Sequence, residues 1–170
     1  MVYKVKNKEI IATKVIGIEN NSSIEEIAID GKDNVFFATS TGGYELKYNE
    51  NWITKITDIN TQVRTIAVDS QGNIIIGTDN QSAYLLFATE LVKEKPKAVL
   101  INELENKSSI NVIAVDNQNN VYYGLHNGLY IIENNQKMPI KVNEINSSVF
   151  TIKIFKSTCS SKSDFSCCME

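Results

Sequence analysis

Cysteine is absent from most of this 170-residue chain. The three cysteines are Cys159, Cys167 and Cys168, near its end. The rest of the chain is therefore not a disulfide scaffold. The tail, 156–170, is rich in Ser, Lys and Cys and has no CxxC spacing. We interpret it as a disordered tail, with metal binding or a disulfide as the alternative.

Proline and basic clusters are also scarce. With 2 prolines and 8 glycines, no segment has the composition of a collagen or of a Pro-rich linker. Lys and Arg number 17 against 20 Asp and Glu, and the net charge is -3. Because a nucleic-acid-binding protein normally carries a basic patch, we expect no nucleic-acid partner. No apolar run approaches the roughly 18 residues of a transmembrane helix, so we expect no membrane partner.

The chain does contain an internal repeat. An apolar run that closes on aspartate occurs at 27–30, 66–69 and 113–116. The copies are 39 and 47 residues apart, and a period of roughly 40–50 residues is typical of β-propeller blades. A link of three residues and a second apolar run follow each copy. These runs are short and rich in Val, Ile, Tyr and Phe, which indicates strands.

The sequence thus predicts an all-β fold, a β-propeller of four-stranded antiparallel blades. It divides residues 1–155 into a half blade, three full blades and the start of a further blade, at 1–19, 23–59, 62–104, 109–145 and 148–155. Known propellers close with 4–8 blades, so we expect a partial propeller. The alternative is a distorted four-bladed ring closed by the two end segments. The fourth, outermost strands are expected at 9–18, 52–59, 97–104 and 140–145.

Two residue types recur once per blade. Asp30, Asp69 and Asp116 end the first strand of each unit, where they are either carboxylates around a metal or turn residues that accept backbone N–H groups. Regular recurrence favours the turn. The third strands centre on tyrosines that we expect to fill the space between blades, at Tyr3, Tyr44, Tyr84 and Tyr130.

Signatures of catalysis are missing. His126 is the single histidine, so zinc has no evident ligand set, and no Gly-x-Ser-x-Gly motif is present. We therefore expect no catalytic residues, no metal site and no cofactor. Enzymatic activity stays open but is the less favoured interpretation.

Positions that differ between the copies are better candidates for function. Four residues share one register at the start of the first strands yet differ in chemistry: Glu25, Arg64, Asn111 and Phe150. The links between second and third strands add Thr78, Asp79, His126 and Asn127. Loops on a rigid scaffold commonly carry binding residues. Arg64 and Phe150 are suited to stacking on a planar ring, so we expect a small aromatic or amphipathic ligand here.

The repeat resembles those of known propeller families. The stretch 116–123, Asp-Asn-Gln-Asn-Asn-Val-Tyr-Tyr, and the Gly-Leu-Tyr at 128–130 are similar to repeats of gluconolactonase-like and NHL-type propellers. Their texture is closer to the insect ommochrome-binding proteins, which are secreted and bind a tryptophan-derived pigment. The resemblance implies a non-enzymatic pigment-binding propeller. The alternatives are a metal-dependent lactonase-like hydrolase and a protein-interaction propeller.

The compartment depends on what precedes the sequence. The N-terminus lacks the apolar stretch of a secretory signal. We expect a secreted protein if an upstream signal peptide is missing from this chain, and a cytoplasmic protein otherwise. Five Asn-x-Ser/Thr sequons are weak support for secretion.

Overall fold

The computed structural model describes residues 2–5, 12–19, 21–80, 82–91, 93, 96–103, 108–134, 136 and 138–154. These residues form β-strands and connecting segments, and they contain no helix long and apolar enough to cross a membrane. The half blade contains β1 (Val2–Val5) and β2 (Ala12–Val15). Blade 1 contains β3 (Ile24–Ile29), β4 (Val35–Thr39), β5 (Gly42–Leu46) and β6 (Ile53–Lys55). Blade 2 contains β7 (Val63–Val68), β8 (Ile74–Thr78), β9 (Ser82–Leu86) and β10 (Val99–Glu103). Blade 3 contains β11 (Ile110–Val115), β12 (Val121–Leu125), β13 (Gly128–Ile132) and β14 (Ile140–Lys141).

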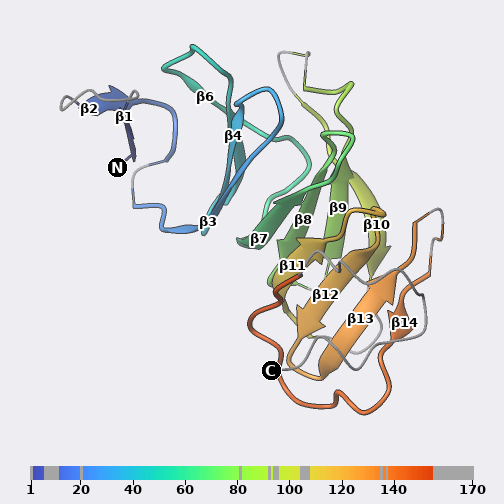
Figure 1. Ribbon diagram of the computed structural model, residues 1–170. Helices are drawn as coiled ribbons and strands as arrows, with labels where there is room; N and C mark the ends of the chain where they lie inside the picture. Colours follow the sequence, from blue (N-terminus) through green and yellow to red (C-terminus); the bar gives the residue numbers. More distant parts are fainter. Residues whose placement is uncertain are drawn as a thin grey trace.

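Each blade is an antiparallel meander whose strands pair in sequence order. Figure 1 shows the blades as successive sheets along the chain, from the blue half blade to the orange blade 3. The all-β class and the four-stranded blades predicted from the repeat are confirmed, and the arrangement is that of a partial propeller.

The core lies between the blades. Phe36 and Ala38 of blade 1 share one apolar cluster with Val63 and Ile66 of blade 2. A second cluster joins residues of blades 2 and 3, and a third joins Val15 to blade 1. A strand sandwiched in this way has both faces covered, which explains why β8 is buried along its whole length and apolar from Ile74 to Gly77. Burial of each such side chain contributes about 1.5–3 kcal/mol.

The tyrosines of the third strands behave as expected. Tyr44 is buried in the cluster between the half blade and blade 1, and Tyr130 in the cluster between blades 2 and 3. Tyr84 packs against the cluster between blades 1 and 2. Only the backbone of Tyr3 is described, so the prediction for its ring is not tested.

One first strand is not covered on both faces. In β3, Ile27 and Ile29 are 53% and 60% exposed, whereas Ile66 and Ile113 of the next two blades are buried. Burial on both faces, as in β8, therefore does not extend to β3. The two-stranded half blade pairs β1 with β2 alone and offers β3 no equivalent neighbour.

The fourth strands are shorter than predicted. The segment expected over 52–59 is a strand only over Ile53–Lys55, and the one expected over 140–145 only over Ile140–Lys141. Among the described residues, the strand expected over 9–18 is β2, and that expected over 97–104 is β10; residues 9–11 and 104 lie outside the described residues. In blade 1 the reason is packing. Ile56 N still donates to Gly43 O at 2.9 Å, but beyond it the chain leaves β5, and Ile56 and Ile59 are buried at 1% and 0% exposure.

The strand expected over 148–155 is not formed in residues 148–154, and 155–170 lie outside the described residues. In the full blades the first strand forms its ladder with a second strand, and residues 148–154 make no such ladder. Val149 nevertheless takes the place that Ile110 takes one blade earlier. A Cβ on Gly77 would lie 2.7 Å from Ile110, and a Cβ on Gly124 would lie 2.7 Å from Val149.

Candidate functional site

Three of the four variable residues at the start of the first strands, Glu25, Arg64 and Asn111, sit at β-bulges, whereas Phe150 lies outside any strand. Between β3 and β4, pairing passes from Ile24–Thr39 to Glu26–Ala38 and leaves Glu25 as the extra residue. The same slip leaves Arg64 in β7 and Asn111 in β11. A bulge re-aims a side chain and sharpens the local twist, so these unlike residues share one geometry. We call this end of the blades the bulge end; it comprises Glu25, Arg64, Asn111 and the links at 40–41, 79–80 and 126–127.

The residues after the bulges of blades 1 and 2, Glu26 and Thr65, each form a hydrogen bond to the next blade. Ile66 N donates a hydrogen bond to Glu26 Oε2 at 2.9 Å, and Ile113 N donates to Thr65 Oγ1 at 3.0 Å. Glu26 and Thr65 hold equivalent positions in successive blades. Their side chains satisfy amides on the first strands, which are sheet edges with no strand beyond them.

The link residues of blade 2 serve mainly to hold the chain. Thr78 is fully buried, and its hydroxyl donates to Ser82 O at 2.8 Å. Asp79 Oδ1 accepts from Thr61 Oγ1 at 2.6 Å, and Asp79 O accepts from Ser109 Oγ at 2.9 Å. Both predicted site residues are thus engaged in fixing the link to its surroundings.

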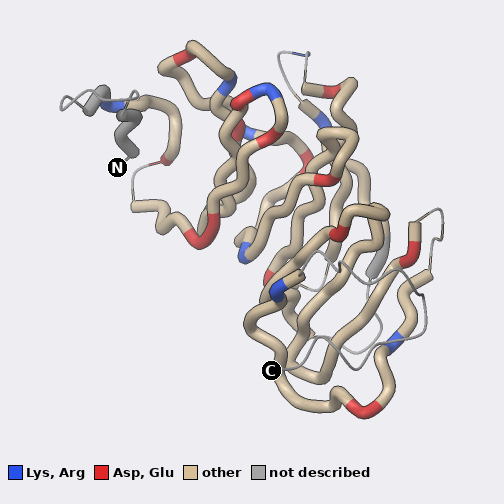
Figure 2. Tube along the Cα trace, in the orientation of Figure 1, with Lys and Arg blue, Asp and Glu red and all other residues tan. Residues whose placement is uncertain are grey.

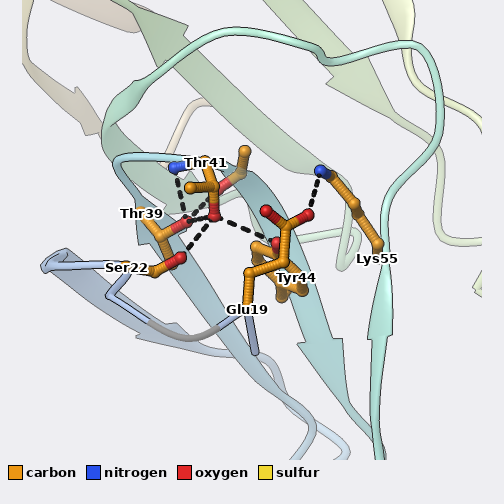
Figure 3. Close-up of polar contacts among 7 residues, drawn as sticks. Glu19, Ser22, Thr39, Thr41, Tyr44 and Lys55 are labelled. Carbon is orange, nitrogen blue, oxygen red and sulfur yellow. Dashed lines mark hydrogen bonds and ion pairs between the residues drawn. The ribbon is translucent and has the colours of Figure 1, made fainter. Parts of the chain in front are cut away.

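Blade 1 builds its link from hydroxyl groups. Figure 3 shows Thr41 at the centre of contacts with Ser22, Thr39 and Tyr44. Beside it, Lys55 Nζ donates to Glu19 Oε1 at 2.9 Å and lies 5.6 Å from the Tyr44 ring centroid. This hydrogen bond raises the pKa of Lys55 and lowers that of Glu19.

Blade 3 brings several predicted residues together. The His126 and Phe150 rings meet edge to face, with centroids 5.5 Å apart and an interplanar angle of 81°. His126 Nδ1 lies 3.2 Å from Ser148 Oγ, and Asn111 Nδ2 donates to Val149 O at 3.2 Å. Phe150 is 66% exposed. We call His126, Phe150 and Asn111 the aromatic corner.

The remaining predicted residues lie nearby or at their own bulges. Asn127 Nδ2 is 3.5 Å from the Tyr130 hydroxyl, and its Oδ1 is a buried atom without a partner in the described structure. Glu25 Oε1 accepts from Ser23 Oγ at 2.7 Å. Arg64 is exposed. The structure therefore assembles the blade 3 residues, while Glu25 and Arg64 are placed separately on blades 1 and 2.

The opposite end of the blades, the turn end, is built alike three times. Asp69 Oδ1 accepts from the backbone N–H groups of Gln71 and Asn73, both at 2.8 Å, and its Oδ2 accepts from Asn73 Nδ2 at 2.8 Å. Asp30 with Asn34 and Asp116 with Asn120 repeat this arrangement. We call each Asp and Asn pair an Asp–Asn clip. The turn role predicted for the aspartates is confirmed.

Sequence reasoning missed the asparagine half of the clip. Asn73 Oδ1 also accepts from Ala88 N at 3.0 Å, so one side chain ties together two turns. Its recurrence at the start of every second strand was the available signal. Burial opposes charge on Asp116, but hydrogen bonds from Asn120 and Gln118 outweigh burial and hold its pKa below the usual value.

Glu45 is a buried carboxyl group that the sequence did not single out. It is 1% exposed, and neither oxygen has a hydrogen-bond partner among the residues the structure describes. Burial raises its pKa to about 7, the nearby Lys47 partly offsets this, and Asp30 and Glu50 add to it. In β5 it pairs across from Phe36, on the face that packs against blade 2.

Two cavities lie between blades at the turn end. One, of about 400 Å³, is lined by the clip turns of blades 1 and 2 together with Ala88 and Leu91. The other, of about 160 Å³, lies between blades 2 and 3. Both cavities are thus at the opposite end of the blades from the predicted binding residues, which lie at the bulge end.

No group of three or more metal-ligating side chains occurs within the described ranges. Figure 2 shows charged residues of both signs distributed over the blades. The lactonase-like alternative, which needs a metal held by acidic and amide groups, therefore gains no support here.

Comparison with known proteins places the fold but not a family. Residues 57–80 match a family model described as a two-component regulator propeller. That segment covers the end of blade 1 and the first two strands of blade 2. No match was found among curated proteins.

Solved structures similar to the chain are β-propeller proteins. They include an extracellular domain described as that of a one-component system from B. thetaiotaomicron, with TM-score 0.61 and 17% identity over 75% of this chain and 18% of that one. YCF48 from Cyanidioschyzon merolae gives TM-score 0.65 and 13% identity over 78% and 45%. A streptogramin B lyase gives 0.55 and 14% over 69% and 40%. The chain thus spans less than half of each, and the likeness shows the fold alone.

Proposed function

We propose that this chain is a non-enzymatic binding propeller that takes a small aromatic, pigment-like ligand at its bulge end. The propeller fold supports a binding or protein-interaction role in general. The aromatic corner supports the narrower choice, since the exposed Phe150 ring is held edge to face by His126. A planar ligand can stack on that ring at little entropic cost because the ring is already positioned.

The neighbouring polar groups suit a ligand with carboxylate or carbonyl substituents. Asn111 and His126 provide polar groups at the aromatic corner, and Arg64, at the bulge of blade 2, is an exposed cation. The resemblance to ommochrome-binding proteins favours a tryptophan-derived pigment. The extracellular setting of the B. thetaiotaomicron neighbours supports a secreted form.

The test is an absorbance titration of the chain with xanthommatin. We expect a saturable change, and Phe150→Ala should weaken binding about tenfold, which corresponds to about 1.4 kcal/mol. Phe87→Ala is the matched control, because Phe87 is also exposed, at 44%, but follows β9 at the turn end. Absence of saturable binding, or equal losses in the two variants, would contradict the proposal.

A further inference from the structure

The cavity between blades 2 and 3 has apolar walls and a polar rim. The walls come from Ile75, Leu85, Ile101, Val121 and Ile132. The rim carries the carboxylates of Asp69 and Glu133 and side-chain amides that include Asn119 and Gln136. Concave sites with apolar walls and a few polar groups are typical of small-molecule binding.

Tyr123 lines the same cavity. The residue is 1% exposed, and its hydroxyl has no hydrogen-bond partner within the described structure. The equivalent positions are Phe37 in blade 1 and Ile76 in blade 2, so blade packing does not require a hydroxyl there. An unpaired buried hydroxyl is unfavourable, so a ligand that accepts its hydrogen bond gains affinity. Burial raises the pKa of Tyr123, so the group stays protonated and able to donate.

The adjacent Tyr122 provides the contrast. Its hydroxyl donates to Asp116 Oδ2 at 3.0 Å, as expected for a tyrosine that serves the blade itself. Tyr123 and Tyr122 are neighbours in β12 and point to opposite faces of the sheet, since side chains alternate along a strand. Only Tyr123 faces blade 2 and the cavity.

The outer wall is shaped by an irregularity in β10. Pairing with β9 slips between Leu100 and Asn102, which leaves Ile101 as the bulged residue. Ile101 lines the cavity, so the bulge places an apolar side chain in its wall. The pairings of β6 and β14 with their neighbours in blades 1 and 3 run without such a slip.

From these features we infer that the cavity is a second ligand site, separate from the bulge end, for a single six-membered ring carrying a carbonyl or amide oxygen. A cavity of about 150 Å³ is known to hold one benzene ring, and this one measures about 160 Å³. The Tyr123 hydroxyl donates to the ligand oxygen. The rim carboxylates of Asp69 and Glu133 disfavour anions, so the ligand is uncharged or cationic.

The experiment is an NMR titration of the full chain with benzamide, toluene and benzoate. We expect saturable amide shifts at Val121–Tyr123 and at Ile75 with benzamide, weaker shifts with toluene, and the weakest with benzoate. Tyr123→Phe should weaken benzamide binding about fivefold or more and leave toluene binding unchanged. Tyr122→Phe is the matched control and should leave benzamide binding unchanged.

A second variant keeps the inference testable without altering the tyrosine. Ile101→Phe enlarges a wall residue and should abolish the shifts of all three probes. The inference is overturned if benzamide gives no saturable shifts, or if Tyr123→Phe binds benzamide as tightly as the unaltered chain. A crystal structure of the benzamide complex in which the Tyr123 hydroxyl donates to a water molecule, and not to benzamide, would overturn it too. Phe150→Ala should not change these shifts, so failure here is distinguishable from failure of the proposed function.

Discussion

The two ends of the same three blades are built on opposite plans. At the turn end, each Asp–Asn clip repeats with hydrogen bonds that differ by no more than 0.1 Å between blades, from 2.8 to 2.9 Å. At the bulge end, the backbone slip repeats but the bulged residue is acidic, basic or neutral. Where the same side chain recurs on the same backbone geometry, the side chain is needed for the fold. Unlike side chains on identical backbone indicate positions that the fold leaves free.

The largest expected effect breaks the uniform end. Asp69→Ala removes the acceptor of three hydrogen bonds and leaves the Gln71 and Asn73 donors unpaired, so unfolding free energy should fall by about 3 kcal/mol. Asp79→Ala, its counterpart at the bulge end, should cost about 1 kcal/mol or less. Urea denaturation of both variants measures the difference. Equal losses would show that the two ends do not differ in structural weight.

The second prediction concerns pH. The pKa of Glu45 is about 7 in the folded state, against 4.5 for an unperturbed carboxyl group such as that of the unfolded chain. Between pH 4.5 and 7 the folded state therefore holds a proton that the unfolded state has released. Stability contributed by this proton is present at acid pH and is lost as the pH rises through 7. A pKa difference of one corresponds to about 1.4 kcal/mol, so unfolding free energy should fall by about 2.5 kcal/mol from pH 5 to 8.

Glu45→Gln should remove most of that pH dependence, because its side chain does not ionise. Glu50→Gln, which alters an exposed carboxyl group nearby, should retain it. Denaturation midpoints at pH 5 and 8 provide the comparison. A wild-type chain equally stable at both values would show that Glu45 is solvated or paired.

The third prediction tests the join between blades. Thr65→Val keeps the shape of the side chain but leaves the buried Ile113 N–H without an acceptor, at an expected cost of about 1–2 kcal/mol. Thr151→Val changes the equivalent register position in the segment after blade 3, where Thr151 is exposed, and should cost under about 0.5 kcal/mol. Thermal denaturation of both variants measures the difference. Equal melting temperatures would show that the Thr65 hydrogen bond does not stabilise the fold.

The smallest expected effects are at the variable bulges. Glu25→Ala and Arg64→Ala alter exposed side chains and should each change unfolding free energy by no more than about 0.5 kcal/mol. Their effect should instead appear in ligand titration. A loss above 1 kcal/mol in either variant would show that the bulge end is as structural as the turn end.

The repeated features of the fold could be predicted from the sequence alone. Copies of Ile-Ala-Val-Asp and the asparagine that follows specify the first two strands and their turn, because local turn chemistry and apolar runs act over few residues. The sequence was insufficient for the fourth strands, where Ile56 and Ile59 are drawn into the core by packing against blade 2. Their alternation with polar residues looked like continued strand.

The candidate sites show the same division. Register is a relation between two strands, so the bulges at Glu25, Arg64 and Asn111 could not be read from one strand's sequence, although their variability was visible. Glu45 lies in a Tyr-Glu-Leu run that reads as one exposed residue between two buried ones. Blade 2 covers that face, and only the packed structure reveals the buried carboxyl group.

The hydrogen bonds between adjacent first strands suit assembly of the blades in the order in which they are synthesised. Each acceptor precedes its donor, Glu26 by 40 residues and Thr65 by 48. During synthesis, the acceptor of a blade therefore leaves the ribosome before the strand that will dock on it. A newly made first strand can add to a surface whose partner groups are already in place, so assembly can proceed blade by blade without waiting for the last residue.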